Sequence, residues 1–349
     1  MRCIKCRGKA VIDLRRHNAA FCREHFVEFF QGQVRRAIEQ FRMFGPDDRI
    51  LVAVSGGKDS LVLWEVLLHL GYRADALYID LGIGDYSAAS TEKVRRFHQQ
   101  RAAPLGADLH VVSLKAAYGF DVDEARDRVR RPPCSACGLS KRYIFNKVAV
   151  DRGYDVVATG HNLDDEAAVL LGNVLRWNMS YLARQWPVLP GGRGFVRKVK
   201  PLVRLTERET AAYAVLTGVD YIVEECPHAV GATSHVYKDL LNRLEQQSPG
   251  SKHQFLFQFY QQGRSQLKVE ERPDLRSCRY CGQPTPGDVC AFCRMTALLL
   301  DQLEQPGGGA AMDSSPAGAQ RSTPGAPVSQ AGPAAAPEAE PASEAGAVN

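Results

Sequence analysis

The amino-acid sequence predicts an α/β fold, a doubly wound parallel sheet flanked at each end of the chain by a small zinc-binding module. Three observations support this. Apolar strand candidates alternate with helix candidates from residue 50 onward, and a glycine-containing turn, SGGKDS (55–60), follows the first of them. Cysteine pairs lie near both ends of the chain. Strands that are buried on both faces and joined by helical crossovers imply a parallel sheet covered on each side.

The expected elements follow in order along the chain. After two cysteine-containing turns around a hairpin-like segment (residues 1–25), an amphipathic helix is expected from about Glu24 to Met43, before a break at Pro46-Asp47-Asp48. The strand candidates are short apolar, β-branched runs: Ile50–Val54, Ala74–Asp80, Asp108–Leu114 and Asp155–Thr159. The helix candidates are Leu61–Leu70, Ser87–Ala103, Leu139–Val150, a stretch after Asp165, and Glu207–Leu216. A Pro/Gly-rich loop spans 187–194, and residues 228–270 look helical and polar.

The charge is uneven along the 349 residues. The whole chain carries +5, but the segment from Pro306 onward has four acidic residues and one arginine, so the remainder carries +8. That segment is rich in Ala, Pro, Gly, Ser and Glu, and we expect 306–349 to be a disordered tail. A basic body suits a polyanionic partner, although a solvated surface with excess Lys and Arg is equally compatible.

The chain shows no signal-peptide pattern and no run of about 18 apolar residues. We therefore expect a soluble, cytoplasmic protein with no membrane partner.

The SGGKDS segment has the composition of a phosphate-binding loop. A strand that ends in such a turn and opens a helix presents backbone N–H groups and the helix dipole to an anion. Two glycines allow close approach of phosphate oxygens, two serines can donate hydroxyls, and a lysine adds charge: Ser55, Gly56, Gly57, Lys58 and Ser60. The alternative is an ordinary glycine turn at a strand–helix junction.

Asp59 distinguishes this loop from the pattern G-x-x-x-x-G-K-[ST], in which the spacing is longer and no acidic residue follows the lysine. A carboxylate in a phosphate loop is costly unless a metal ion or a distinct geometry accommodates it. A second acidic segment, TGHNLDDE (159–166), follows another strand candidate. We expect Asp165 to be a metal ligand or a catalytic acid or base, with Asp164 close by, because α/β sites lie at the carboxyl ends of strands. Helix capping by these residues is the alternative, and both can hold together.

The ten cysteines indicate metal or redox chemistry, because an intracellular chain seldom uses cysteines as a disulfide framework. Two sets have the spacing of structural zinc sites: Cys3-x2-Cys6-x15-Cys22-x2-His25 and Cys278-x2-Cys281-x8-Cys290-x2-Cys293.

Three cysteines remain: Cys134, Cys137 and Cys226. Three thiolates suit a [4Fe–4S] cluster with one iron left open. A catalytic pair that forms a persulfide and a disulfide is the alternative, and three unrelated buried thiols are a further one.

On these residues the chain resembles the PP-loop ATP pyrophosphatase superfamily (adenine nucleotide alpha hydrolase-like), whose hallmark is SGGxDS after the first core strand. Its members cleave ATP between the α and β phosphates, so the resemblance implies that the loop holds departing pyrophosphate with Mg²⁺. It implies these nucleotide-binding residues: Ala53, Ser55, Gly56, Gly57, Lys58, Asp59, Ser60, Asp80, Lys141 and Gly160. Together with the hypotheses for the acidic segment and the cysteines, we expect these catalytic residues: Asp59, Asp165, Lys141, Cys134 and Cys137.

With two terminal zinc modules and the three cysteines, the resemblance narrows to the TtuA family of tRNA 2-thiolation enzymes. The chain looks closer to the bacterial and archaeal members than to the eukaryotic wobble-uridine enzymes. The resemblance runs from Cys3 to about Cys293 and is carried by these segments: LGIGDYS (81–87), PPCSACGLSKRY (132–143), TGHNLDDEA (159–167) and EECPHA (224–229).

This family resemblance implies an activity and its partners. ATP adenylates the C2 oxygen of a tRNA uridine or ribothymidine, and sulfide held at the open iron displaces AMP. The family takes its sulfur from a ubiquitin-like carrier protein with a C-terminal thiocarboxylate, and a homodimer is usual in it. Two competing functions remain, another PP-loop tRNA enzyme such as a 2-thiocytidine synthetase, and a non-catalytic zinc-knuckle RNA-binding protein.

We divide the chain into five parts. They are an N-terminal zinc finger, a PP-loop catalytic domain, a helical extension that contributes Cys226, a C-terminal zinc finger and the tail. Their bounds are 1–28, 29–225, 226–272, 273–305 and 306–349.

Overall fold

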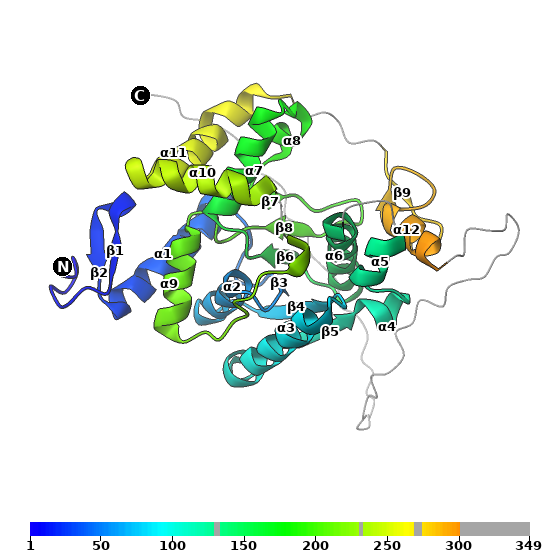
Figure 1. Ribbon diagram of the computed structural model, residues 1–349, viewed down its shortest axis with the longest axis horizontal. Helices are drawn as coiled ribbons and strands as arrows, with labels where there is room; N and C mark the ends of the chain where they lie inside the picture. Colours follow the sequence, from blue (N-terminus) through cyan, green and yellow to red (C-terminus); the bar gives the residue numbers. More distant parts are fainter. Residues whose placement is uncertain (129–132, 230–232, 269–273, 301–349) are drawn as a thin grey trace, which may run out of the picture. The chain divides into compact units, whose positions relative to one another are not determined.

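The structure is a computed structural model, and it describes residues 1–128, 133–229, 233–268 and 274–300 (Figure 1). The expected tail (306–349) and the end of the expected C-terminal zinc finger lie outside the described residues. In the part of the chain that the structure describes, none of the helices is both long enough and apolar enough to cross a membrane.

A six-stranded mixed sheet forms the centre of the fold, in the order β5-β4-β3-β6-β8-β7. Its first four strands run parallel, β8 is parallel to β6, and β7 is the antiparallel edge strand. The strands have these bounds: β3 Ile50–Val54, β4 Ala74–Asp80, β5 Leu109–Ser113, β6 Val156–Thr159, β7 Val188–Leu189 and β8 Arg197–Val199. The predicted parallel α/β sheet is confirmed, with β7 and β8 as an unpredicted addition in and beside the expected Pro/Gly-rich loop.

The strand order reverses at β3. The chain proceeds from β3 outward through β4 to β5, and then returns to place β6 on the other side of β3. In open α/β sheets, ligands bind at such a switch point, outside the carboxyl ends of the strands. Here the segments that follow those two strand ends are SGGKDS after β3 and TGHNLDDE after β6.

Side chains alternate between the two faces of the sheet, and each face has its own core. Ile50, Val52 and Val54 join one core with helices α1, α2, α3 and α9, whereas Leu51 and Val157 join the other with α6 and α12. The helices from α1 to α6 have these bounds: α1 Arg23–Phe41, α2 Lys58–His69, α3 Gly84–Phe97, α4 Leu114–Tyr118, α5 Val122–Arg128 and α6 Pro133–Asp151. The later helices are α7 Leu163–Leu175, α8 Met179–Arg184, α9 Glu207–Thr217, α10 Thr233–Gln247, α11 Ser251–Gln258 and α12 Ala291–Leu299.

The two terminal modules extend different cores. The N-terminal hairpin, β1 (Ile12–Leu14) and β2 (Ala19–Phe21), adds Cys3 and Phe21 to the core that contains α1. The C-terminal hairpin, β9 (Arg276–Ser277) and β10 (Pro284–Thr285), and α12 add Cys278 and Cys290 to the opposite core. The N-terminal module therefore packs against one face of the sheet, and the C-terminal module packs against the other face.

The largest differences from the sequence expectation lie at helix starts. Helix α6 begins at Pro133 and not near Leu139, so that Cys134 and Cys137 belong to its first turns. Proline suits the first helical position, because the N–H that it lacks has no helical partner there. Helix α2 begins at Lys58, which places Lys58, Asp59 and Ser60 in its first turn. The short helices α4 and α5 were not predicted.

Candidate active site

The phosphate loop joins β3 to α2 through a tight turn. Gly56 adopts φ +80°, and a Cβ there would lie 3.1 Å from the backbone oxygen of Ser90 in α3. The Ser60 hydroxyl receives a hydrogen bond from the Ser55 amide (3.1 Å) and donates to the Gly57 carbonyl (3.0 Å). The N-cap of α2 is Gly57, which has no side chain to cap the helix, so the first-turn N–H groups can face an anion.

Gly160 brings the second loop against the first. A Cβ at Gly160 would lie 2.8 Å from the amide nitrogen of Ser60 and 2.9 Å from the carbonyl carbon of Asp59. The backbones of the two loops are therefore in direct contact, and only glycine fits between them without a shift of one loop.

We expect Gly160→Ala to lower the free energy of unfolding by about 1–3 kcal/mol and to weaken ATP binding, because the added methyl group pushes the phosphate loop away. Thermal denaturation and titration calorimetry with ATP test this. Gly32→Ala is the matched control, because Gly32 is an exposed residue of α1 with nothing within 4 Å of a Cβ. It should be neutral or stabilising by up to about 1 kcal/mol. Unchanged ATP affinity in Gly160→Ala would contradict the close approach.

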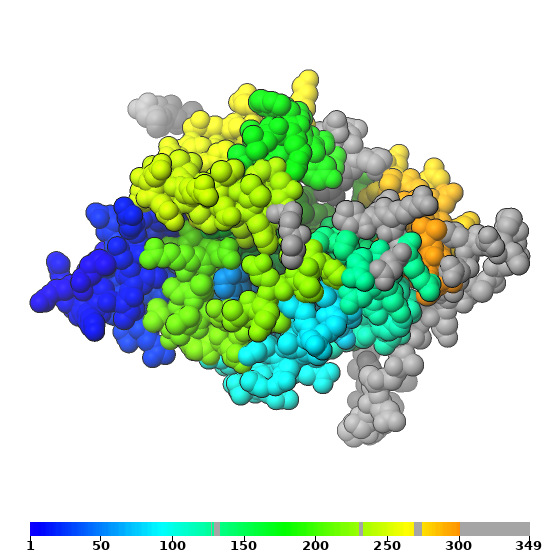
Figure 2. All heavy atoms as spheres, viewed as in Figure 1, coloured from blue at the N-terminus to red at the C-terminus, as the bar shows by residue number. Residues whose placement is uncertain are grey.

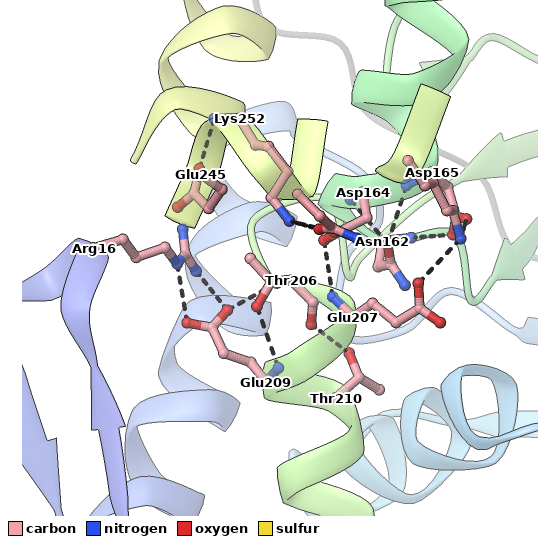
Figure 3. A network of polar contacts seen from close by, with 12 residues as sticks. Arg16, Asn162, Asp164, Asp165, Thr206, Glu207, Glu209, Thr210, Glu245 and Lys252 are labelled. Atoms are coloured by element: carbon pink, nitrogen blue, oxygen red, sulfur yellow. Dashed lines mark hydrogen bonds and ion pairs between the residues drawn. The ribbon is translucent and has the colours of Figure 1, made fainter. Parts of the chain in front are cut away.

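Two lysines alternate with three carboxylates at the mouth of the loop. Lys58 Nζ lies 3.1 Å from Asp59 Oδ2 and 2.8 Å from Glu207 Oε1. Lys238 Nζ, from α10, lies 2.6 Å from Asp165 Oδ1 and 3.2 Å from Glu207 Oε2. Figure 3 shows the side chains of Glu207 and Asp165 directed toward one another.

Asn162 closes this chain of contacts into a ring. Its side-chain amide donates to Asp59 Oδ1 (3.1 Å), and its backbone N–H donates to Asp165 Oδ2 (3.0 Å). Its side-chain oxygen also caps α7 by accepting from the Asp165 amide (3.1 Å), so capping and site formation hold together here. We call this set the ion-pair ring: Asp59, Lys58, Glu207, Lys238, Asp165 and Asn162.

In the ring, burial disfavours the charged form of each ionisable side chain, whereas a neighbouring opposite charge favours it, and the pKa values depend on which effect is larger. Burial raises the pKa of Asp59, and the nearby Asp165 adds to this against the opposing charge of Lys58. For Glu207, burial is outweighed by Lys58 and Lys238, which lower its pKa to about 2. The pKa of each lysine is raised, because its carboxylate partners outweigh burial. Glu207 and both lysines are therefore charged at neutral pH.

Asp164 lies behind the ring and is buried. Its carboxylate pairs with the buried Lys252 of α11 and accepts from the Glu207 amide (2.9 Å). Lys252 Nζ also donates to Asn242 Oδ1 (2.7 Å). Asp164 is thus a structural partner that ties α7, α9 and α11 together, whereas Asp165 faces the ring.

The three remaining cysteines lie close to one another. The pKa of the Cys137 thiol is raised by burial and by the charges of Cys226 and Cys134, against the opposing effect of Lys141. Cys134 is exposed, and its Sγ contacts the His228 carbonyl at 3.3 Å. Lys141 therefore lies beside the cysteines, one helical turn after Cys137.

The cysteines and the phosphate loop are joined by short connections. Ile222, four residues before Cys226, donates its backbone N–H to the Gly56 carbonyl at 2.9 Å. Tyr86 of α3 lies near Cys226 and Cys137. Burial raises the pKa of Tyr86, and the charges of these two cysteines add to that effect. Ser90, one turn further along α3, packs on Gly56. The phosphate loop and the three thiols thus share the carboxyl-end edge of the sheet.

The two terminal tetrads fit zinc. Their ligand atoms lie within 4.8 Å of one another in each set, Cys3, Cys6, Cys22, His25 and Cys278, Cys281, Cys290, Cys293. Tetrahedral ligands at about 2.3 Å from zinc are about 3.8 Å apart. The Sγ–Sγ distances are 3.8 Å between Cys6 and Cys22 and 3.7 Å between Cys281 and Cys290.

Among the described residues, it is these two tetrads whose ligand atoms all lie within 4.8 Å of one another. The three central cysteines do not meet this distance and are spaced more widely. Wider spacing is what a multi-iron cluster requires, because the body of the cluster lies between its thiolate ligands.

The remaining predicted nucleotide residues also lie at strand ends. Ala53 is the penultimate residue of β3, paired with Thr159 of β6. Asp80 ends β4, and its Oδ1 accepts from the Gly82 amide at 3.1 Å.

Sequence reasoning missed Glu207 and Lys238. Glu207 was only the expected start of a helix, where an acidic residue is unremarkable, and Lys238 was one of many charges in a polar helical stretch.

Comparison with known proteins identifies related chains. Residues 30–229 match the PP-loop domain family model, and residues 2–27 match the N-terminal LIM domain of the 2-thiouridine synthetase TtuA. The tRNA-5-methyluridine(54) 2-sulfurtransferase of Thermus thermophilus is 52% identical over 84% of this chain and 91% of its own length. The Pyrococcus horikoshii protein of the same name is 46% identical over 85% and 94%.

Among solved structures, the U34-tRNA thiolase NcsA from Methanococcus maripaludis with its [4Fe-4S] cluster has a TM-score of 0.72 at 25% identity. The match covers 84% of this chain and 95% of that one.

The switch-point geometry, the SGGKDS loop and the second acidic loop define the catalytic core of a PP-loop enzyme. With its N-terminal module and the relatives described above, the chain belongs to the TtuA family of tRNA 2-thiolation enzymes. The family predicted from the sequence is confirmed.

Proposed function

We propose that this protein is an ATP-dependent tRNA 2-sulfurtransferase that replaces the C2 oxygen of a uridine or ribothymidine. By analogy with the named relatives, the target is 5-methyluridine at position 54. The observation that carries the proposal is the Ile222–Gly56 hydrogen bond at 2.9 Å, which holds the segment leading to Cys226 against the phosphate loop. One edge of the sheet thus joins ATP activation to sulfur delivery.

The residues of the phosphate loop, Ser55–Ser60, bind the pyrophosphate that leaves when ATP adenylates the base. Backbone N–H groups and Lys58 stabilise the charge that develops on it. Asp59 and Asp165 face one another across Asn162 and supply carboxylate oxygens, the ligands that Mg²⁺ prefers. Ala53, Asp80 and Gly160 line the nucleotide site at the strand ends.

Cys134, Cys137 and Cys226 would hold a [4Fe–4S] cluster, which would supply the chemistry that delivers sulfur to the activated base. Lys141 lies beside Cys137, where its ammonium can serve both the cysteines and a nucleotide phosphate. The two terminal tetrads hold structural Zn²⁺. The neighbouring Asp123, which pairs with His228 at 2.7 Å, positions the segment that follows Cys226.

The proposed partners are tRNA, a ubiquitin-like sulfur carrier with a C-terminal thiocarboxylate, and a second copy of this chain in a homodimer. We propose that the protein is cytoplasmic. We also propose that its five parts meet after residues 28, 225, 272 and 305.

The test is mass spectrometry of tRNA nucleosides after anaerobic incubation with ATP and sulfide. We expect an ATP-dependent 2-thio product at a uridine or ribothymidine. We expect Lys58→Met to lower its rate by at least about 100-fold, the effect of losing one charge-stabilising donor in an active site. Lys115→Met is the control, because Lys115 is exposed and pairs with Glu124 in α5. A thiocytidine product would indicate the competing synthetase, and an absence of any ATP-dependent product would indicate a non-catalytic RNA-binding protein.

A further inference from the structure

The ion-pair ring contains a second ammonium group at the mouth of the phosphate loop. Lys58 and Lys238 contact the same carboxylate, one at each oxygen of Glu207, at 2.8 and 3.2 Å. The two side chains are about equally accessible, 19% and 24% exposed. Lys238 therefore lies as close to the centre of the ring as the loop lysine does.

The ring can attract a polyanion only if Lys58 and Lys238 leave their carboxylate partners and contact the ligand instead. Three carboxyl groups share two ammonium groups, so each ammonium is already paired with carboxyl oxygens when no ligand is bound. The triphosphate of ATP would meet repulsion from Asp59 and Asp165 unless cations balance it. Both lysines are protonated, and neither leaves its carboxylate without a replacement anion of comparable charge. Phosphate oxygens are such a replacement.

The ring is also accessible from outside. In Figure 2, atoms coloured as the residues around the phosphate loop are visible between the yellow-green atoms of α9 and α10. These are the helices that contribute Glu207 and Lys238. A nucleotide that enters between them meets both lysines and Glu207 together.

We propose that Lys238 is a second phosphate-binding residue for ATP, and that Glu207 is the counter-ion which both lysines leave when the nucleotide binds. This inference rests on the proposed function, since it names a residue for its ATP step. A bound triphosphate thereby ties α10 to the phosphate loop.

The experiment measures the binding of ATP and of AMP to the anaerobically purified full chain by titration calorimetry, with Mg²⁺ present. We expect Lys238→Gln to weaken ATP binding by about tenfold or more and AMP binding by less than about twofold, because only ATP has the β and γ phosphates. Lys238→Arg should restore most of the ATP affinity. Lys147→Gln is the matched control, since Lys147 is 25% exposed and pairs with Asp151 on α6.

Glu207→Gln separates a binding role from a structural one. If Glu207 is a counter-ion to be displaced, its removal should tighten ATP binding, opposite in sign to Lys238→Gln. A merely structural ion pair would make both variants bind ATP more weakly, and that result overturns the inference. So does equal loss of ATP and AMP affinity in Lys238→Gln. If the wild-type protein binds ATP and thiolates tRNA while Lys238→Gln binds normally, only this inference fails. If the wild-type protein binds no ATP, the proposed function fails with it.

Discussion

Replacing Arg16 with methionine is expected to lower the free energy of unfolding by about 3–5 kcal/mol. Arg16 lies in the turn of the N-terminal module and forms a bidentate pair with Glu209 of α9, at 3.0 and 2.6 Å (Figure 3). It also donates to the Arg204 carbonyl at 2.9 Å. The Arg16 side chain is 7% exposed and that of Glu209 is 2% exposed, so the substitution leaves a buried carboxylate without its main partner.

The effect should extend to the active site, because Glu209 also caps α9. Its carboxylate accepts from the Thr206 amide (2.8 Å), and Thr206 caps the Glu209 amide in return (3.2 Å). Glu207, at the first position of this helix, holds Lys58 and Lys238. The N-terminal module thus fixes the helix end that carries the counter-ion of the ring, and Arg16→Met should alter ATP affinity as well as stability.

The stability loss should depend on pH in a defined direction. Burial would raise the pKa of Glu209, but hydrogen bonds from His17 and Arg16 and the charge of Arg16 outweigh it and lower the pKa from 4.5 to about 2. A carboxyl with a lowered folded-state pKa contributes stability above pH 4.5, which is lost as the pH falls toward 2. Without Arg16, burial raises this pKa, and the penalty fades as the group takes up a proton. The difference between the two proteins should therefore begin to shrink above pH 4.5, where Glu209 of the variant takes up its proton, and should continue to shrink down to about pH 2.

Urea denaturation of the zinc-loaded proteins measures this difference from neutral pH down to the lowest pH at which both proteins keep their zinc, because protonation of the Cys and His ligands releases the metal. Arg276→Met is the control, because Arg276 pairs with Asp288 at 3.3 Å and both side chains are more than 70% exposed. Such a surface pair is worth about 0–1 kcal/mol. A loss below about 1 kcal/mol in Arg16→Met, or a loss that does not change with pH, would show that Glu209 finds other partners.

The parts of this site that were predictable from the sequence are local ones. The strand Ile50–Val54 and the glycine turn that follows it depend on neighbouring residues, as do the cysteine spacings of the zinc modules. Alternating strands and helices made the sheet predictable, and with it the edge where the acidic loop meets the phosphate loop. Each of these features depends either on residues that are close together in the sequence or on the general rule that connected parallel strands have their carboxyl ends at one edge of the sheet.

Neither the ion-pair ring nor the separate Arg16–Glu209 pair was predictable in the same way. Lys58 and Glu207 are 149 positions apart, and Arg16 and Glu209 are 193 apart. Their sequence surroundings, a helix start and a short basic turn, are common on solvated surfaces. Only the packing of α9 and α10 against the sheet domain shows that these charges meet. The start of α6 was misplaced for a related reason, since glycine and proline near Cys137 predict a loop when the tertiary contacts are unknown.

Replacing Cys226 with alanine is expected to reduce the rate of tRNA thiolation by at least about 100-fold. Outer partners of metal ligands already contribute about 10–100-fold, so loss of a ligand should cost no less. Cys226 is half-buried beside Cys137 and Tyr86, and its segment is held to Gly56 through Ile222. That backbone hydrogen bond does not involve the thiol, so ATP binding should survive the substitution.

Metal analysis separates the cluster from persulfide chemistry at the same three cysteines. If they hold a [4Fe–4S] cluster, anaerobically purified Cys226→Ala loses its iron and keeps the zinc of the terminal tetrads, since those sites share no ligand with Cys134, Cys137 or Cys226. A persulfide and disulfide mechanism needs thiols but no iron, so an iron-free wild-type protein would then still thiolate tRNA. Cys6→Ala provides the reverse control, because it removes a zinc ligand and should leave the iron content unchanged. Thiolation that persists in Cys226→Ala would exclude the three-cysteine cluster, because two thiolates cannot leave only one iron of a four-iron cluster open.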